Sequence, residues 1–444
     1  MKVTSFPSDP GPAAWNALLP AAKPREALDD HESADWLIIG AGFAGLSAAR
    51  RLSELHPGDR IVVLEARQIA SGPAGRNSGF MIDLPHVLTA KDYTGDIDKD
   101  TADIRLNRAG IDYALDAKEA YGMSDEAISL CGKVNSAVTG RGVEHNKNYA
   151  HYLDNLSEPY EILNAQQMQD ITGSAVYQNG LFSPGTAMLQ PAMYIRALAD
   201  GICSKQLSIF ENSPVISLEK QGTSWIATTK KAKVRASKVF LTVNGHLESF
   251  GYAIDKLMHV YTYASMTRAL TKSEVQQLGG EPSWALTPAD AMGTTVRRIS
   301  GSGGDRIIVR NTATFDPSLH VAESRITKVA KTHDLSYQYR FPVLKHVPIE
   351  YRWGGRLCLS RNNVSVFGQI DDNLFSACCQ NGLGTAKGTV SGKLIAELAS
   401  GEPSLLLADQ LAEDYPNKLP PKPIAAIGAN AVLRWGEFRA GKEL

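Results

Sequence analysis

Gly40, Gly42 and Gly45 are spaced as G-x-G-x-x-G, and Glu65 follows at the end of the next apolar run. In a strand-to-helix turn, the first glycine permits the tight turn, the second lets a pyrophosphate approach the backbone, and the third lets the helix pack against the strand. The helix N-terminus offers free N–H groups to the phosphate. A carboxylate after the next strand accepts hydrogen bonds from two ribose hydroxyls and repels a 2′-phosphate. The four residues therefore predict binding of the adenosine half of FAD or NAD, and not of NADP.

The segments around these residues have the patterns of the elements that must position them. DWLIIG at 35–40 and IVVLEA at 61–66 are apolar runs typical of buried strands, and 43–55 has the helical spacing of small and apolar residues. The three segments form a β-α-β unit of roughly thirty residues. A structural glycine-rich turn is the alternative, but the complete strand-helix-strand context favours the dinucleotide interpretation.

A second glycine-rich stretch, SGPAGRNSGF at 71–80, follows the strand that ends in Glu65. Its glycines predict a loop whose backbone N–H groups closely approach a bound group. Arg76 and Asn77 are polar donors that can address phosphate and ring carbonyls, or Arg76 reaches past the cofactor to a substrate. We expect Gly79→Val to lower cofactor occupancy more than it destabilises the fold.

Composition restricts the class of protein. The 444 residues are 43% hydrophobic and 21% charged, as in ordinary globular chains, and the length predicts about two to three compact units. With 46 basic and 47 acidic side chains the net charge is -1, so nucleic acid and anionic membranes are not expected partners. The five cysteines form no CxxC pair, which predicts reduced thiols, and no HExxH motif or spaced Cys/His set indicates a metal. Neither a signal peptide nor an apolar run of ~20 residues is found, so a soluble, cytoplasmic protein is expected.

The pattern of elements divides the chain into three parts. Residues 1–34, rich in proline and charge, predict an arm over the surface with Trp15 and Leu18 as anchors. The nucleotide-binding domain is expected to be discontinuous, with helices at 190–202 and 386–401, and to comprise 35–100, 163–250 and 355–444. The remaining parts are assigned to a substrate-binding domain, which has a helix at 101–122 and comprises 101–162 and 251–354.

Longer stretches resemble one family. They are GAGFAGLSAARRL, VVLEARQIASGPAGRNSGF, KVFLTVNGH, RWGGRLCLSRNNVSVFGQI and NGLGTAKGTVSGKLIAELASG. Together they resemble the FAD-dependent amine and amino-acid oxidoreductases of the D-amino-acid oxidase (DAO) superfamily, and are nearest in pattern to the glycine, sarcosine and γ-glutamylputrescine oxidases. The resemblance implies an α/β chain, α+β overall, with a Rossmann-like FAD-binding domain of the glutathione-reductase type. A mostly antiparallel β substrate domain would be inserted into it.

The resemblance also implies which residues bind FAD. Those of the glycine motif and the strand after it are Gly40, Ala41, Gly42, Phe43, Ala44, Gly45, Glu65, Ala66 and Arg67. Those of the second loop and of two later strands are Ser71, Arg76, Asn77, Ser78, Gly79, Val215 and Asn244. Those at the start of the last helix are Gly382, Leu383, Gly384, Thr385, Ala386 and Lys387. Arg67 pairs with Glu65, lies over the adenine or is solvated.

The start of the helix at 386–401 has a physical argument of its own. Hydride transfer to a flavin leaves negative charge at the N1/C2 carbonyl edge of its ring, and a helix N-terminus aimed there stabilises that charge. Lys387 would add a positive charge, and an ordinary glycine-rich helix start is the alternative interpretation.

Cys358 lies near the place from which sarcosine oxidases make a thioether to the flavin. A covalent link would raise the flavin potential and prevent its loss. A buried apolar cysteine is the more common use of such a residue, and we favour it.

Candidates for substrate binding fall where the resemblance is weakest, at 251–354. Alternation places His259, Tyr261 and Tyr263 on one face of a strand, as an aromatic cage for an amine or as sheet core. An arginine could clamp a substrate carboxylate through two hydrogen bonds. The arginines considered are Arg297, Arg298 and Arg352, the last beside Trp353.

The implied reaction is oxidation of a C–N bond in a small amine or amino acid. A C–H next to the nitrogen gives a hydride to flavin N5, water hydrolyses the imine, and oxygen or a quinone reoxidises the cofactor. The enzyme would be an oxidase or a dehydrogenase. Two rival hypotheses are an NAD-dependent dehydrogenase on the same nucleotide fold and a non-catalytic flavin-binding protein.

Overall fold

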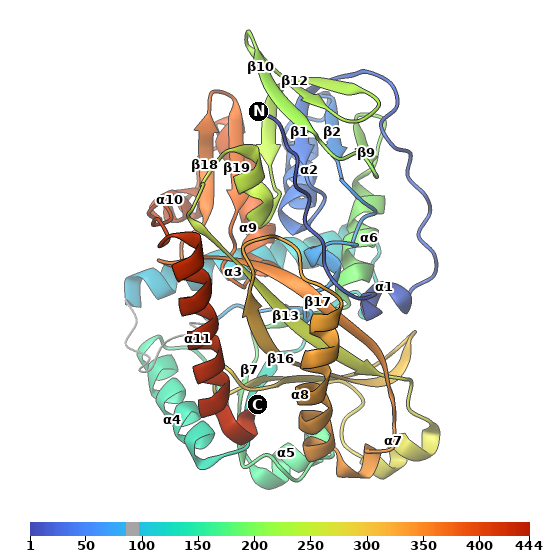
Figure 1. Ribbon diagram of the computed structural model, residues 1–444, viewed down its shortest axis with the longest axis vertical. Helices are drawn as coiled ribbons and strands as arrows, with labels where there is room; N and C mark the ends of the chain where they lie inside the picture. Colours follow the sequence, from blue (N-terminus) through green and yellow to red (C-terminus); the bar gives the residue numbers. More distant parts are fainter. Residues whose placement is uncertain (86–96) are drawn as a thin grey trace.

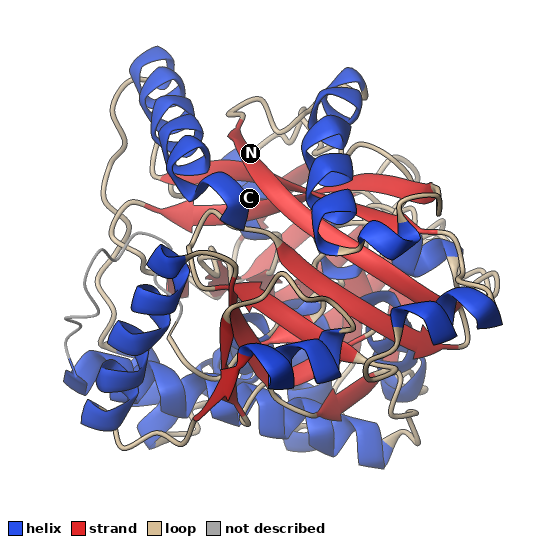
Figure 2. Ribbon diagram, turned by 90° about the horizontal axis from the view of Figure 1, so that it is seen from below, coloured by secondary structure: helices blue, strands red, loops and turns tan. Residues whose placement is uncertain are grey.

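The computed structural model describes residues 1–85 and 97–444 and contains two large β-sheets, drawn one above the other in Figure 1. The upper sheet carries the glycine motif, and the lower sheet carries most of the segments assigned to substrate binding. Two helices stand on one face of the lower sheet, as the view from below shows (Figure 2).

The first sheet is built on parallel strands in the order β9-β2-β1-β12-β19. A further strand, β18, pairs antiparallel with β19, and a hairpin of β10 and β11 pairs with the first half of β12. The bounds are β1 Glu32–Ile39, β2 Ile61–Leu64, β9 Leu207–Phe210, β10 Ser217–Gln221, β11 Ser224–Thr228, β12 Lys233–Leu241, β18 Val366–Asp371 and β19 Leu374–Cys378. All four residues of β2 are buried, as expected of a parallel strand covered on both faces.

Helices α2 (Phe43–Leu55), α6 (Pro191–Ile202) and α9 (Ala386–Ser400) pack into one apolar core with this sheet. The close approach of α9 depends on glycine. A Cβ on Gly392 would lie 2.1 Å from the carbonyl oxygen of Ala44 in α2. Since no side chain fits between the two backbones, the helices pack at the minimum distance.

The second sheet has the order β17-β13-β16-β15-β14-β5-β7-β6 and is antiparallel except between β14 and β5. Its strands are β5 Lys133–Ala137, β6 Glu161–Asn164, β7 Asn179–Ser183, β13 Leu257–Thr267, β14 Trp284–Pro288, β15 Thr295–Gly301, β16 Gly304–Phe315 and β17 Ile349–Ser360. The two helices on its outer face are α8 (Ser324–Arg340) and α11 (Lys422–Ala440) (Figure 1).

The other elements connect or cover the sheets. A small sheet has the order β3-β8-β4, with β3 Phe80–Met81, β4 Ile128–Leu130 and β8 Ala187–Leu189. The remaining helices are α1 Ala14–Ala17, α3 Ile97–Ala120, α4 Gly140–Asn155, α5 Ala165–Thr172, α7 Lys272–Leu278 and α10 Leu405–Leu411, and the 3-10 turns are Pro73–Gly75, Asn244–Phe250, Pro342–Leu344 and Gly441–Glu443. Within the described ranges, none of the helices has the length and apolar character needed to cross a bilayer.

The helices expected at 43–55, 190–202 and 386–401 are confirmed within one residue. The helix expected at 101–122 is α3, which begins at the edge of the described residues and ends at Ala120. Helices α4, α8 and α11 were not predicted from the sequence.

The expected domain boundaries differ from the sheets and need correction. Strand β7 lies in a segment assigned to nucleotide binding, yet it pairs with β5 in the second sheet. Strand β17 continues through the expected boundary at 355, because it pairs with β13 along its whole length. Two helices also belong to the other layer from the one expected. Helix α3, assigned to the substrate-binding domain, packs on α9 of the first layer, and α11, assigned to the nucleotide-binding domain, packs on β16 of the second sheet.

The arm at the N-terminus is tied to the protein by aromatic side chains. Trp15 is completely buried, lies edge-on to Trp353 with ring centroids 6.4 Å apart, and donates its Nε1 hydrogen to the Asn77 carbonyl at 2.8 Å. Phe6 lies against the His246 ring, with centroids 5.7 Å apart. The arm thus joins the loop at 71–80 to β17.

We expect Trp15→Ala to lower the free energy of unfolding by about 3–5 kcal/mol, because it removes a fully buried aromatic ring and leaves a cavity. The measurement is urea unfolding followed by circular dichroism. Trp435→Ala is the matched control: this tryptophan is 62% exposed, so its loss should change stability by no more than about 0.5 kcal/mol. Equal effects of the two substitutions would contradict the anchoring role of Trp15.

Candidate functional site

A long cavity opens at the carboxyl ends of the parallel strands β1, β2 and β12, where Ile39, Leu64 and Thr242 line it. Ligands of open α/β sheets bind at this edge. The wall continues over the start of α2, the loop at 71–80 and the start of α9, and it ends on strands of the second sheet. The cavity therefore joins the two layers.

The three glycines of the first motif have different neighbours. A Cβ on Gly45 would lie 1.8 Å from the Gly40 carbonyl oxygen, and one on Gly40 would lie 2.7 Å from the Thr242 carbonyl oxygen. A Cβ on Gly42 would meet no protein atom closer than 3.8 Å, and Gly42 lines the cavity. The protein itself thus requires Gly40 and Gly45, whereas the space beside Gly42 is available to a ligand. Among the described residues no side chain caps α2, so its first N–H groups remain available to an anion.

Glu65 lies at the cavity just beyond β2, as the motif predicts. One carboxylate oxygen accepts a hydrogen bond from Ala41 N at 3.0 Å, and the other accepts from Arg67 N, also at 3.0 Å. Burial raises the pKa of Glu65, and the two N–H donors oppose that shift. The Arg67 side chain donates to the Pro7 carbonyl of the arm, and it is the backbone N–H of Arg67 that contacts Glu65.

The loop at 71–80 is held more tightly than the sequence suggested. Arg76 is buried, and its Nε donates to the Gly354 carbonyl at 2.7 Å, while its Nη2 donates to the Pro10 and Gly11 carbonyls at 2.5 Å each. Arg76, Asn77 and Ser78 line the cavity. Arg76 was expected to contact phosphate, ring carbonyls or a substrate, and its Nε and Nη2 instead connect the arm to β17.

Gly79 does not face the cavity, which corrects its expected role. Its φ is +76°, and a Cβ there would lie 2.1 Å from Arg297 Nη1 and 2.4 Å from the Leu189 carbonyl oxygen. A valine at this position would therefore disturb the fold itself, and not cofactor occupancy alone. Gly45, Ser71 and Ala386 likewise do not line the cavity, whereas Val215 and Asn244 do.

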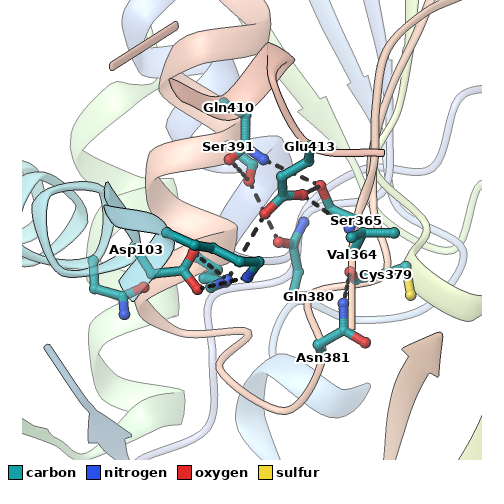
Figure 3. A network of polar contacts seen from close by, with 12 residues as sticks. Asp103, Val364, Ser365, Cys379, Gln380, Asn381, Ser391, Gln410 and Glu413 are labelled. Carbon is teal, nitrogen blue, oxygen red and sulfur yellow. Dashed lines mark hydrogen bonds and ion pairs between the residues drawn. The ribbon is translucent and has the colours of Figure 1, made fainter. Parts of the chain in front are cut away.

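The start of α9 forms another wall of the cavity through Gly382, Leu383, Gly384 and Thr385. Lys387 is not part of this wall, because its Nζ lies 2.9 Å from an Asp103 oxygen of α3 and 3.9 Å from Glu413. Figure 3 shows Asp103 and Glu413 within a polar network that also includes Ser365, Ser391 and Gln410. Lys387 thus anchors α9 to α3, which corrects its expected contact with a flavin.

The second sheet contributes Thr262, Thr287, Thr295 and Arg310 to the cavity. Arg310 lies opposite Thr295 in the ladder, and its Nη1 donates to the Thr295 hydroxyl at 3.4 Å. Within residues 1–85 and 97–444 no carboxylate lies within ion-pair distance of Arg310, and burial lowers its pKa to about 10. This arginine was not among the predicted substrate-binding residues, and its signal in the sequence is its place in the strand-like run RIIVRNT.

The six residues first considered for substrate binding lie elsewhere, outside the described part of the cavity wall. His259 contacts Glu248, and Tyr261 packs with Tyr263, Val321 and Val329 beneath α8. Arg298 donates to the Gly279 carbonyl, and Arg352 pairs with Asp334 at 2.6 Å. These contacts favour the sheet-core interpretation of this face of β13 over the aromatic cage.

Two further residues line the cavity with unpaired nitrogen atoms. Both ring nitrogens of His246 and Nη1 of Arg356 are buried and have no hydrogen-bond partner within residues 1–85 and 97–444. Burial lowers the pKa of His246 to about 3, and the positive charge of Arg356 acts in the same direction. His246 is therefore neutral, whereas Arg356 beside it is a cation with a nitrogen free to bind a ligand.

Lys133 lies directly behind the cavity wall. It is buried on β5, where its Nζ contacts the Asn135 side-chain oxygen and lies 3.3 Å from the Thr287 hydroxyl. Burial lowers the pKa of Lys133 to about 8. Because Thr287 lines the cavity, one hydroxyl group separates the lysine from a bound molecule.

Cys358 is buried in the apolar core with Cys378 and Cys379, outside the described wall of the cavity. The neighbouring Cys379 thiol and burial raise the pKa of Cys358 well above its usual value. A thiol in these surroundings stays protonated, so the geometry favours a core role over a covalent link.

The chain matches a family model and several proteins of known sequence. Residues 35–398 match the family model described as FAD dependent oxidoreductase (DAO). The chain is 25% identical to the probable oxidoreductase OrdL of Haemophilus influenzae, over 84% of this chain and 85% of that protein. It is 24% identical to the gamma-glutamylputrescine oxidoreductase of Escherichia coli, over 85% of this chain and 86% of that protein.

Solved structures show the same fold. The glycine oxidase from Geobacillus kaustophilus superposes with a TM-score of 0.70 at 16% identity, covering 86% of this chain and all of that one. The L-amino acid deaminase from Proteus myxofaciens superposes with a TM-score of 0.65 at 15% identity, covering 91% of this chain and 95% of that one. The mixed α/β architecture predicted from the sequence is thereby confirmed.

We expect Gly42→Ala to weaken dinucleotide binding without lowering stability, because the new methyl group occupies cavity space and touches no protein backbone. The measurement is the dissociation constant of added FAD, from the change in its fluorescence, together with the unfolding midpoint of the protein without FAD. Gly45→Ala is the matched control and should lower the midpoint, since its Cβ would overlap the Gly40 carbonyl. A fall in the midpoint for Gly42→Ala would contradict this assignment.

Proposed function

The chain belongs to the family of FAD-dependent oxidoreductases, and from that premise we propose that it oxidises the C–N bond of an amino acid whose carboxylate binds Arg310. The single observation that carries this substrate class is the desolvated guanidinium on the cavity wall, which has no acidic partner among the described residues. A substrate carboxylate would supply that partner through charge-assisted hydrogen bonds.

The residues around the cavity fit FAD from one end to the other. Glu65 would hold the ribose hydroxyls, the N–H groups at the start of α2 would bind the pyrophosphate beside Gly42, and Val215 would contact the adenine. The loop residues Asn77 and Ser78 and the α9 start would surround the ring. When bound, FAD accepts the hydride that leaves the carbon next to the nitrogen.

The start of α9 has the electrostatics that this chemistry requires. Among the described residues no side chain caps the helix, and Gly382, Leu383 and Gly384, which precede its first turn, line the cavity. Its N–H groups would stabilise negative charge on a carbonyl edge placed against them. The Thr385 hydroxyl, which donates to the Phe80 carbonyl at 2.6 Å, holds this turn against the loop that ends at 80.

The nitrogen-containing substrate class is supported by the relatives. The names of the similar proteins specify γ-glutamylputrescine, glycine and L-amino acids as their substrates. All three carry a carboxylate and an amino group. An NAD-dependent dehydrogenase is disfavoured, because the family is defined by FAD.

The amine must lose its proton before its carbon can release a hydride. Burial lowers the pKa of Lys133 to about 8, so its unprotonated form can take up that proton at Nζ: the Thr287 hydroxyl accepts the proton of the amine and turns its own hydrogen from Asn135 to Lys133. Asn135, which accepts hydrogen bonds from both Thr287 and Lys133, keeps the two groups in contact. The hydrolysis of the imine product requires only water.

Anaerobic addition of amino acids to the holoenzyme tests the proposal. An amino-acid substrate should bleach the flavin absorbance near ~450 nm. Failure of D- and L-amino acids, N-methyl amino acids and γ-glutamyl amines to do so would favour a non-catalytic flavoprotein.

We expect Arg310→Gln to weaken amino-acid binding about 10- to 100-fold, since a charge-assisted hydrogen bond contributes about 1.5–3 kcal/mol. The measurement is the substrate concentration that half-bleaches the flavin. Arg352→Gln is the matched control, because this arginine pairs with Asp334 outside the cavity wall, and it should change the value little. An equal loss for an amine without a carboxylate would contradict the role of Arg310.

We expect the rate of anaerobic bleaching to rise with pH through about 8, where Lys133 loses its proton. Lys133→Met and Lys133→Arg should both abolish this rise of the rate with pH, since neither side chain can accept a proton there. Stopped-flow measurements between pH 6 and about 10 would check it, that range covering both sides of the lysine pKa. If the rate still rises with pH in both variants, the group that titrates is the substrate amine and not Lys133.

A further inference from the structure

Helix α11 turns an apolar face toward the solvent. Ile424, Ile427, Trp435 and Phe438 are 63%, 73%, 62% and 77% exposed, and their spacing places them on one side of the helix. The Trp435 and Phe438 rings are stacked, with centroids 5.8 Å apart. We call these four residues the apolar face of α11. A surface helix ordinarily turns such a face toward the core.

The other side of α11 holds the helix to β16 by polar contacts. Asn430 accepts a hydrogen bond from Phe315 N at 3.1 Å and donates to the Phe315 carbonyl at 3.0 Å. Glu437 accepts from Ala313 N at 3.1 Å, and Arg434 donates to the Ala313 carbonyl. The apolar face is therefore not needed to attach the helix, and its orientation is fixed by the polar side.

The exposed charged side chains from residue 416 to the C-terminus are all basic. From residue 416 to the C-terminus the sequence has five basic residues and two acidic ones. The two acids, Glu437 and Glu443, are buried, and Glu437 pairs with Arg434, whereas Lys418, Arg439 and Lys442 are exposed. The outer surface of this segment thus combines aromatic and aliphatic side chains with positive charge, although the whole chain has a net charge of only -1.

We propose that the apolar face of α11 docks on the surface of an anionic lipid membrane, with the helix lying in the plane of the interface. Basic amphipathic helices with aromatic residues on the apolar side bind in this way, through buried apolar area and attraction to acidic headgroups. A second copy of the chain is the other candidate occupant. A two-fold symmetric pairing would bring the basic rims of both helices together, and the repulsion between them opposes it.

The position of α11 connects this surface with the cavity. A Cβ on Gly436 would lie 2.8 Å from Met292, and the Glu443 carbonyl just after the helix accepts a hydrogen bond from Thr294 N at 2.7 Å. Met292 and Thr294 flank Gly293, and Thr295 follows; both Gly293 and Thr295 line the cavity. The proposed lipid contact therefore lies behind the substrate-side wall. It goes beyond the proposed reaction and does not depend on it.

The test is flotation of the full-length holoenzyme with vesicles of phosphatidylcholine alone and of phosphatidylcholine with phosphatidylglycerol. We expect binding to the acidic vesicles, weakened by salt, and little binding to the neutral ones. The double variant Trp435→Ser/Phe438→Ser should lose at least tenfold in binding while its FAD absorbance is unchanged. Leu130→Ser on β4 is the matched control, because Leu130 is also exposed and should not affect binding.

A charge variant separates the electrostatic contribution to membrane binding from the contribution of the buried apolar area. Arg439→Gln should weaken binding to acidic vesicles about fivefold, which corresponds to about 1 kcal/mol for one basic residue near an acidic surface. Lys230→Gln, an exposed lysine between β11 and β12, should leave binding unchanged. Absence of binding to acidic vesicles would overturn the proposal. So would light scattering that shows a dimer which the Trp435/Phe438 variant converts to a monomer, since a second copy would then occupy the face.

Discussion

The N-termini of α2 and α9 meet at one cavity because glycine lets the two helices approach until their backbones touch. Gly392 faces the Ala44 carbonyl with no room for a side chain, and Gly45 faces the Gly40 carbonyl in the same manner. Both helices follow strands of the parallel sheet, so both begin at its carboxyl edge. Two sets of free N–H groups thereby point into one cavity, and an anionic cofactor is the partner that such an arrangement fits.

The rest of the cavity is organised around this convergence. Lys387 and Asp103 fasten α9 to α3, and Arg76 fastens the loop at 71–80 to the arm and to β17. Charged side chains near the cavity are thus used largely for holding its walls together. Arg310 and Arg356 differ from them, because Arg310 has no acidic partner and one Arg356 nitrogen has no partner at all among the described residues. These two cations are the places where a bound molecule can still gain charge-assisted contacts.

Local patterns were enough to predict much of the first layer. The spacing of Gly40, Gly42 and Gly45 and the position of Glu65 identified the cavity edge, since each role depends on the backbone within one β-α-β unit. The helices at 43–55 and 386–401 were recognised from their periodicity. The second sheet was harder. Its strands are paired across long distances in the chain, as with β5 beside β14, so no short window of sequence shows which residues face one another.

The sequence by itself determined the family, the cofactor class and the fold of the nucleotide-binding layer, because these depend on short motifs whose residues act on neighbouring backbone. The tertiary structure decided which polar side chains are free to act. Tyr261 and Arg310 lie on paired strands; Tyr261 was a candidate from the sequence and Arg310 was not, yet of these two residues it is Arg310 that lines the cavity. That difference follows from strand alternation and from which elements cover each face of the sheet. Likewise, the outward turn of Trp435 and Phe438 on α11 follows from the hydrogen bonds that β16 makes to the opposite side of the helix.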